Sequence, residues 1–220
     1  NTQRIRRSLD KIICLGKNYL DHAKELGDAI PENPVLFLKP ASCAVPLKPG
    51  VPVWYPDLGS EVHHECEVVL RLKTGGFRLS LEQARASVDA VTLGLDMTLR
   101  ELQTQQKSKG HPWEIAKAFP CSALTAPFID IQKFANFENE PFQFELDGVV
   151  RQRGVARDMR MNVYESIRYA SQFFLLRPGD LIFTGTPAGV GPVQDGSRGL
   201  LKWSSHIETE VVWRAVQTPK

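Results

Sequence analysis

Residues 61–70 read Glu61-Val62-His63-His64-Glu65-Cys66-Glu67-Val68-Val69-Leu70, the alternating pattern of a half-buried β-strand. Side chains on a strand point to opposite faces in turn, so Cys66 and Val68 lie on an apolar face while Glu65 and Glu67 share the other. Two carboxylates a few ångströms apart repel each other unless a cation lies between them. We therefore expect a divalent cation at this strand, and ligand atoms that are all oxygen favour Mg2+ or Mn2+ over zinc.

The composition limits the kind of protein that carries this strand. With 220 residues, 42% of them hydrophobic, the chain is long enough for one sizeable core, and we expect a single domain over residues 1–220. A formal charge of +2 without a Lys/Arg block argues against nucleic acid, and no apolar run reaches the length of a transmembrane helix. The four cysteines are widely spaced and form no C-x-x-C pair, which predicts reduced thiols and an intracellular protein.

Short strands with a few interspersed helices predict a mixed α+β domain. The strongest turn signal is Asp147-Gly148, which predicts a hairpin between strands at 142–146 and 149–150. Thr98-x-x-Glu101 fits a capping box, which predicts that a helix starts at Thr98. Further strands are expected at 11–15, 35–38, 91–95, 181–183, 200–203 and 207–213, and further helices at 21–26, after Ser80 and over 162–175.

Asp96 is the candidate third carboxylate. It ends the predicted strand at 91–95, and if that strand lies beside the one with the two glutamates, Asp96 completes a three-carboxylate site with open positions for substrate. Two alternatives stay open at this point. One is that the acids lie on a solvated sheet face, and the other is a zinc site formed by His63, His64 and Cys66. Alternation disfavours the zinc site, because it turns Cys66 away from the carboxylates.

His22 and Glu25 are three residues apart on a short predicted helix and therefore share a face. A carboxylate beside an imidazole orients the ring and raises its basicity, which suits a general base that acts on water. A surface ion pair is the alternative interpretation. Flanking Pro and Gly residues would allow this segment to act as a lid.

Residues 184–191, Thr-Gly-Thr-Pro-Ala-Gly-Val-Gly, follow a predicted strand but lack the Gly-Lys-Ser/Thr ending of a nucleotide-binding loop. A loop whose backbone N–H groups and threonine hydroxyls bind a small carboxylate is the favoured interpretation. Arg100, Gln103 and Lys117 are candidate partners for such an anion.

Six motifs occur in order along the chain. They are Gly16-Lys17-Asn18-Tyr19-x-x-His22-x-x-Glu25, Val35-Leu36-Phe37-Leu38-Lys39-Pro40, His63-His64-Glu65-Cys66-Glu67, Leu95-Asp96-Met97-Thr98-x-Arg100, Pro112-Trp113-x-x-Ala116-Lys117 and Thr184-Gly185-Thr186-Pro187-x-Gly189-Val190-Gly191-Pro192. Together they resemble the fumarylacetoacetate hydrolase family, most closely its short acylpyruvase and oxaloacetate decarboxylase branch, over about residues 11–203.

The resemblance implies a mixed β-roll of the fumarylacetoacetase C-terminal-domain type with a few short helices, assembled as a homodimer. It implies that Mg2+ or Mn2+ is held by Glu65, Glu67 and Asp96. The catalytic residues it implies are His22, Glu25 and Lys117, and the substrate-binding residues are Lys17, Arg100, Gln103 and Thr186. Many relatives have arginine where this chain has Lys17, and lysine keeps the charge but loses the planar fork for bidentate binding.

The function implied by the resemblance is hydrolysis of the C–C bond of acylpyruvates, decarboxylation of oxaloacetate, or both, through a pyruvate enolate. Alternatives on the same fold are a 2-hydroxyhepta-2,4-diene-1,7-dioate isomerase or decarboxylase and an oxaloacetate tautomerase. A metal-binding or ligand-binding module without activity is the non-enzymatic alternative, but such a module would not need His22 and Glu25. The expected partner is a small 2-oxo acid, with no nucleic acid and no membrane. The expected location is the cytoplasm, or the mitochondrial matrix in a eukaryote.

Overall fold

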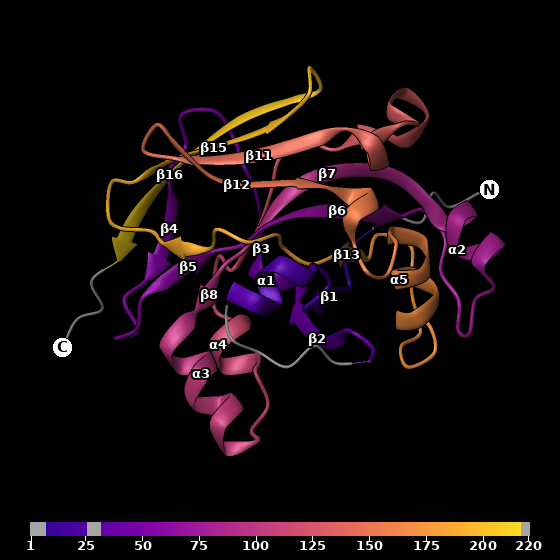
Figure 1. Cartoon of the computed structure of the whole chain (residues 1–220), viewed down its shortest axis with the longest axis horizontal. Coiled ribbons are helices and arrows are strands. Elements are labelled where there is room, and N and C mark those ends of the chain that lie inside the picture. The colour runs from indigo at the N-terminus through magenta and orange to yellow at the C-terminus, as the bar shows by residue number, and fades with distance from the viewer. Residues whose placement is uncertain (1–7, 26–31, 217–220) are drawn as a thin grey trace.

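The computed structural model describes residues 8–25 and 32–216, without the side chains of residues 22–24. Its largest sheet has the strand order β2-β1-β13-β6-β7-β9-β3, with β10 paired to β7 (Figure 1). These strands are β1 (Lys11–Gly16), β2 (Val35–Pro40), β3 (Ala44–Pro46), β6 (Cys66–Leu72), β7 (Val88–Asp96), β9 (Ala123–Thr125), β10 (Ile129–Asp130) and β13 (Leu181–Phe183).

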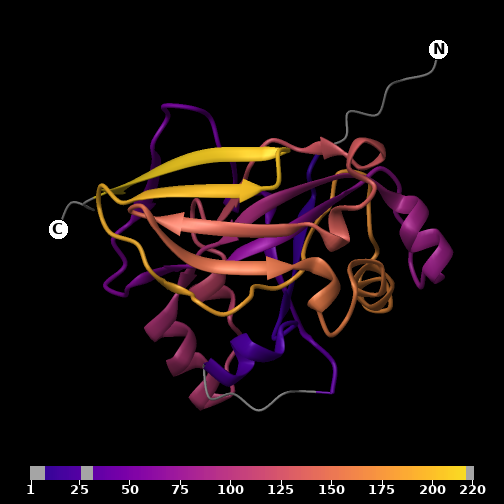
Figure 2. The ribbon, with the colours of Figure 1, turned by 45° about the horizontal axis from the view of Figure 1, so that its top comes forward.

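Two further sheets complete the β structure. One has the order β12-β11-β15-β16-β4, and it lies across the largest sheet as the orange and yellow layer of Figure 2. Its strands are β4 (Val53–Pro56), β11 (Pro141–Leu146), β12 (Val149–Val155), β15 (Arg198–Trp203) and β16 (Ile207–Val216). The third sheet is small, with the order β14-β5-β8, and consists of β5 (Val62–His64), β8 (Thr98–Leu99) and β14 (Gly191–Pro192).

The helices are short and lie around the sheets. They are α1 (Leu20–Glu25), α2 (Leu81–Ser87), α3 (Arg100–Lys109), α4 (Glu114–Lys117) and α5 (Val163–Ala170). Helices α3 and α4 lie together on one side of the molecule, whereas α2 and α5 lie together at one end of the sheets (Figure 1). Among the described helices, none is long and apolar enough to cross a membrane.

Strand β6 is buried on both faces, which decides the environment of the acidic residues. Val68 and Leu70 belong to the main core, together with Phe144 and other aromatic residues of the second sheet. Val69 points to the opposite face and packs in a second apolar cluster with residues of β1 and β13. Glu67 shares the face of Val69, as the alternation predicts, but it is only 2% exposed. The solvated-face alternative is therefore wrong.

Several predicted elements are confirmed. The hairpin pairs Leu146 with Val149, and both turn residues have positive φ, 52° for Asp147 and 78° for Gly148, as a type I′ turn requires. Ser80 caps α2 through a capping box with Gln83. The predicted strands at 11–15, 35–38, 91–95, 181–183, 200–203 and 207–213 all fall within observed strands.

Two predictions about the acidic stretch and the following helix are wrong. The strand expected at 61–70 is divided into β5 and β6, with Glu65 at the break between them. Thr98 does not cap a helix: it lies in β8, paired with His63, and α3 starts only at Arg100. The Thr98 hydroxyl donates to the Asp96 carbonyl oxygen at 3.1 Å, so it is not used as a helix cap.

Two helix boundaries also differ from prediction. Helix α5 ends at Ala170 rather than at residue 175, because Leu176 pairs with Gly76 through two backbone hydrogen bonds of 3.0 Å and the chain must turn before it. Helix α1 starts at Leu20, one residue before the expected start at residue 21. The expected end of this helix at residue 26 lies outside the described residues.

Candidate active site

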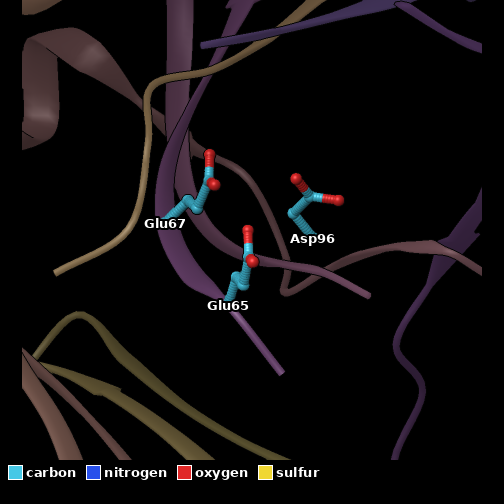
Figure 3. A group of neighbouring side chains, drawn as sticks. All are labelled: Glu65, Glu67 and Asp96. Carbon is cyan, nitrogen blue, oxygen red and sulfur yellow. The ribbon is translucent and has the colours of Figure 1, made fainter. Parts of the chain in front are cut away.

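Glu65, Glu67 and Asp96 converge at the junction of the large and small sheets (Figure 3). One ligand oxygen from each lies within 4.8 Å of the others. The pairing of β6 with β7 sets this geometry, because Cys66 lies opposite Leu95 and the Asp96 N–H donates to the Glu65 carbonyl at 2.8 Å. The three residues are 5%, 2% and 1% exposed, so their charges need partners inside the protein.

Three cationic side chains meet this acidic cluster. The Lys117 ammonium lies 2.8 Å from Glu65 Oε2 and 2.8 Å from Asp96 Oδ2. The Lys39 ammonium lies 2.7 Å from Asp96 Oδ1, and the Arg100 guanidinium forms an ion pair with Glu65 Oε1. Lys117 therefore lies between two of the carboxylates, in contact with both.

Glu67 is held differently, by the backbone N–H of Gly185, which donates to its Oε2 at 2.8 Å. Burial, followed by the charges of Asp96 and Glu65, raises the pKa of Glu67 well above its ordinary value. Burial lowers the pKa of Lys117, but the charges of Asp96 and Glu65 outweigh it and the net shift is upward. The cluster thus favours added positive charge, and three oxygen donors at this spacing could hold a hard divalent cation.

A cleft opens over the acidic cluster and brings the predicted substrate-binding residues together. It is lined by Leu15, Gly16, Lys17, Phe37, Glu65, Glu67, Asp96, Arg100, Gln103, Lys107, Trp113, Lys117 and Thr186. Gln103 is buried and its side-chain oxygen accepts from Arg100 at 2.7 Å. Thr186 donates from its hydroxyl to the Cys66 carbonyl at 2.8 Å, which attaches the 184–191 loop to β6.

The same loop also contacts helix α1. The backbone N–H of Gly189 donates to the Glu25 carboxylate, at 3.1 Å from Oε1 and 3.2 Å from Oε2. Gly189 has φ of +97°, and a Cβ atom there would lie 1.9 Å from the Arg151 carbonyl oxygen, so the loop requires glycine. The side chain of His22 is outside the described part of α1, and its pairing with Glu25 stays a prediction.

The zinc alternative does not match the described geometry. Cys66 faces the main core, and burial raises the pKa of its thiol, which keeps it in the neutral form. His64 has its Nδ1 3.0 Å from Gln152 Oε1. In the described part of the chain, neither His63 nor His64 is part of the acidic cluster that could hold a metal ion.

Sequence reasoning missed three buried polar residues of this region, Lys39, Thr98 and Gln152. Lys39 donates to the carbonyl oxygens of Met97 at 3.2 Å and Ser122 at 2.8 Å and also to that of Lys117, besides its ion pair with Asp96. The sequence held one indication of this role, since Lys39 directly follows the apolar run Val-Leu-Phe-Leu. A lysine that continues such a buried strand requires polar partners inside the protein.

Thr98 and Gln152 also fix the position of the acidic cluster. The Thr98 hydroxyl accepts from the Lys117 ammonium at 2.6 Å. Gln152 Oε1 accepts from the Cys66 N–H at 2.9 Å, while its Nε2 donates to Thr186 Oγ1 at 2.7 Å and to the Pro187 carbonyl at 2.9 Å. Gln152 thereby joins β12, the break before β6 and the 184–191 loop. No motif in the sequence identifies this role, which depends on long-range packing.

This fold and this site define a family. The family model described as fumarylacetoacetate (FAA) hydrolase C-terminal matches residues 11–217, and the chain belongs to this family. The structure of fumarylpyruvate hydrolase from Pseudomonas aeruginosa in complex with Mn2+ and pyruvate superposes with a TM-score of 0.89 at 38% identity, over 94% of this chain and 91% of that one. The predicted family and fold are thereby confirmed.

Two curated relatives carry names of specific reactions. Oxaloacetate tautomerase YcgM of Escherichia coli (strain K12) is 37% identical over 202 residues, which is 91% of each chain. The mitochondrial oxaloacetate decarboxylase of Dictyostelium discoideum is 39% identical over 186 residues, 84% of this chain and 85% of the relative.

Proposed function

We propose that this protein is a divalent-metal-dependent enzyme that acts on oxaloacetate by moving a proton between C3 and the 2-oxo group, as a tautomerase. The observation that carries the proposal is the buried cluster of Glu65, Glu67 and Asp96 with Lys117 against it, at the floor of the cleft. The names of the E. coli and Dictyostelium relatives support oxaloacetate as the substrate. Tautomerisation and decarboxylation share the enolate of the 2-oxo acid, so one site can serve either reaction.

The residues present fit a hard divalent ion. Glu65, Glu67 and Asp96 offer only carboxylate oxygens, which suit Mg2+ and Mn2+, and the Mn2+ named with the P. aeruginosa relative supports this choice. A bound ion of this kind would act as a Lewis acid toward the 2-oxo group and orient the substrate. We propose these three residues as its ligands.

The side chains of the cleft supply the remaining chemistry. We assign Arg100 and Gln103 to binding the carboxylate beside the 2-oxo group, and the hydrogen bond between them fixes both side chains in place. Thr186 is the third residue assigned to this carboxylate; its hydroxyl donates to the Cys66 carbonyl in this structure and would turn toward the substrate on binding. Lys117 would stabilise the negative charge that develops on the substrate as the C3 proton leaves, because its ammonium already lies at the floor of the cleft. His22, oriented by Glu25, is the proposed base that takes this proton.

C–C bond hydrolysis of an acylpyruvate is the second candidate function. It is favoured by the similarity to fumarylpyruvate hydrolase and by the contact of Glu25 with Gly189, which brings α1 to the cleft loop. In this version His22 would take a proton from water instead of from C3, and the hydroxide would attack the distal carbonyl. Homodimer assembly and a cytoplasmic or mitochondrial location also remain proposals from the family resemblance.

The test follows oxaloacetate, added in its enol form, with metal-depleted protein before and after Mg2+ is supplied. Loss of the enol absorbance that depends on Mg2+, without pyruvate release, supports the tautomerase; equal rates of pyruvate release indicate a decarboxylase. Acetylpyruvate is the comparison substrate, and its cleavage to pyruvate indicates the hydrolase. Absence of turnover on all three routes with Mg2+ bound would overturn the proposed function. His22→Ala, with exposed His206→Ala as the matched control, tests the base.

A further inference from the structure

The side-chain amide of Gln152 makes every hydrogen bond that an amide can make, although its strand lies at the edge of the second sheet. Its oxygen accepts from the Cys66 N–H at 2.9 Å and lies 3.0 Å from His64 Nδ1. Its nitrogen donates to the Thr186 hydroxyl at 2.7 Å and to the Pro187 carbonyl at 2.9 Å. The residue is fully buried, so these four bonds hold the amide in one orientation.

The direction of each bond follows from two backbone groups. The N–H of Cys66 can only donate and the carbonyl of Pro187 can only accept, so the amide oxygen faces Cys66 and the amide nitrogen faces Pro187. The nitrogen is therefore also the donor to Thr186. Because the Thr186 oxygen accepts from Gln152, the hydroxyl proton must point to another group, which is the Cys66 carbonyl at 2.8 Å in this structure.

A β-bulge brings Gln152 to this position. In the hairpin of β11 and β12, Gln152 lies opposite Phe144 and Val150 lies opposite Glu145, so Arg151 is an extra residue of β12. Residues directly opposite each other share a face of the sheet, and Phe144 lies in the main core. In a regular ladder Arg151 would take the place opposite Phe144. The bulge thus buries Gln152 and leaves Arg151 exposed.

The loop of residues 184–191 packs on this bulge and carries Thr186 into the cleft. A Cβ atom at Gly189 would lie 1.9 Å from the Arg151 carbonyl oxygen and 3.4 Å from Gln152 Cγ, so loop and bulge are in close contact. Thr186 is among the residues that line the cleft, whereas Gln152 is not. Any influence of Gln152 on a bound substrate is therefore transmitted through another residue.

We propose that Gln152 is a positioning residue that orients the Thr186 hydroxyl toward the carboxylate of the substrate. The inference rests on the proposed function, which assigns Thr186 to that carboxylate. On binding, the hydroxyl proton would turn from the Cys66 carbonyl to the substrate. The bond from Gln152 uses a lone pair of the Thr186 oxygen and not its proton, so the oxygen stays in place during this turn. A donor fixed before binding costs less ordering when the substrate arrives.

A double-mutant cycle on pyruvate affinity tests the proposal, because pyruvate has the carboxylate beside a 2-oxo group. Affinity is measured by calorimetric titration with Mg2+ at a concentration that saturates each variant. Thr186→Val removes the hydroxyl and should weaken binding about tenfold, as the loss of a hydrogen bond to a charged group does. Gln152→Met should weaken it about five- to tenfold when Thr186 is present, but less than about twofold in the Thr186→Val background.

Gln143→Met is the matched control, since Gln143 lies on the outer face of the same hairpin and donates to Glu145; it should bind pyruvate as the native protein does. Unchanged affinity in Gln152→Met would overturn the proposal. So would losses that multiply in the double variant, to about 50-fold or more, because Gln152 would then act independently of Thr186. If urea unfolding shows that Gln152→Met does not fold, Gln152→Glu replaces it in the cycle with the same expectation, since it retains the acceptor oxygen and replaces the nitrogen.

Steady-state kinetics with enol oxaloacetate give a second readout. Gln152→Met should raise KM about five- to tenfold and leave kcat within about threefold, because the carboxylate contact is made equally before and during the reaction; a fall in kcat with unchanged KM would overturn the positioning role.

The two proposals fail in different ways. The expected pyruvate cycle in a protein without turnover would overturn the tautomerase and leave the role of Gln152 standing. Turnover with losses that multiply would do the reverse. If the Mg2+-saturated native protein bound no pyruvate, the positioning role would be overturned, and the turnover assay alone would decide the proposed function.

Discussion

The buried His64 predicts a specific loss of stability in acid. Its side chain is fully buried, its ring packs at a tilt of 49° with its centroid 4.6 Å from that of Phe144, and its Nδ1 lies 3.0 Å from Gln152 Oε1. Because Nε2 of Gln152 donates to Pro187, its Oε1 is the acceptor, so His64 carries its proton on Nδ1 in the neutral form. Burial is the main reason that the pKa of His64 is lowered from 6.5 to about 4.

The native state loses stability in acid because the unfolded chain takes up a proton that the native state does not. In the unfolded chain the pKa of His64 has its ordinary value of 6.5, so between pH 6.5 and 4 the unfolded state binds a proton that the native state does not. The contribution of neutral, buried His64 to native stability is fully present above pH 6.5 and is lost as the pH falls through this window. At 1.36 kcal/mol per pH unit, the loss between pH 7.5 and 4.5 is about 2.5 kcal/mol.

The assay is urea unfolding at pH 7.5, 6.5, 5.5 and 4.5, followed by tryptophan fluorescence, for the native protein and His64→Gln. Subtracting the two unfolding free energies at each pH removes the groups that titrate in both proteins. The unfolding free energy of the native protein minus that of His64→Gln should fall by about 2.5 kcal/mol from pH 7.5 to pH 4.5. A difference that stays constant over this range would refute the reasoning; His206→Gln, at an exposed position, controls for loss of an imidazole.

Two further substitutions test the supports of the site. Lys39→Met leaves Asp96 with Lys117 as its remaining buried cation and removes the donor to the Met97 and Ser122 carbonyl oxygens. The unfolding free energy measured in urea should therefore fall by about 3–5 kcal/mol, and a loss below about 1 kcal/mol would contradict the ion pair. Gly189→Ala cannot keep φ of +97° with Cβ 1.9 Å from the Arg151 oxygen, so turnover should fall at least about tenfold in steady-state kinetics. Gly59 has φ of +68°, but a Cβ atom there would have no other atom within 4 Å, so Gly59→Ala is the control and should leave the kinetics unchanged. An equal loss of turnover in both variants would argue against a role of the 184–191 loop.

The acidic strand could be predicted from the sequence because its information is local. Alternation with a period of two puts Glu65 and Glu67 on the face opposite Cys66, and this holds even though the strand is broken at Glu65. The turn at Asp147-Gly148 could also be predicted from the sequence, because only a few residue types readily adopt its two positive φ angles. Pairing of Asp96 with the acidic strand required long-range information, which six ordered motifs supplied through the family.

Other features depend on contacts that no short pattern encodes. Thr98-x-x-Glu101 has the residues of a capping box, but Thr98 pairs with β5 and bonds to Lys117, so tertiary contacts override the local signal. Lys39 and Gln152 each join segments far apart in the sequence, for example Gln152 to the N–H of Cys66, 86 residues away. The role of such residues follows from their burial, which a single sequence does not display.

Metal binding by the acidic cluster is most directly tested by titrating metal-depleted protein with Mn2+ and measuring the free ion by electron paramagnetic resonance. We predict one tightly bound Mn2+ per chain, weakened at least about tenfold in Glu67→Gln, which removes a ligand charge from the cluster. Glu61→Gln, in the same stretch but with a largely exposed side chain, should bind as the native protein does. Absence of stoichiometric binding to the native protein, or equal affinity in Glu67→Gln, would contradict a metal site built from Glu65, Glu67 and Asp96.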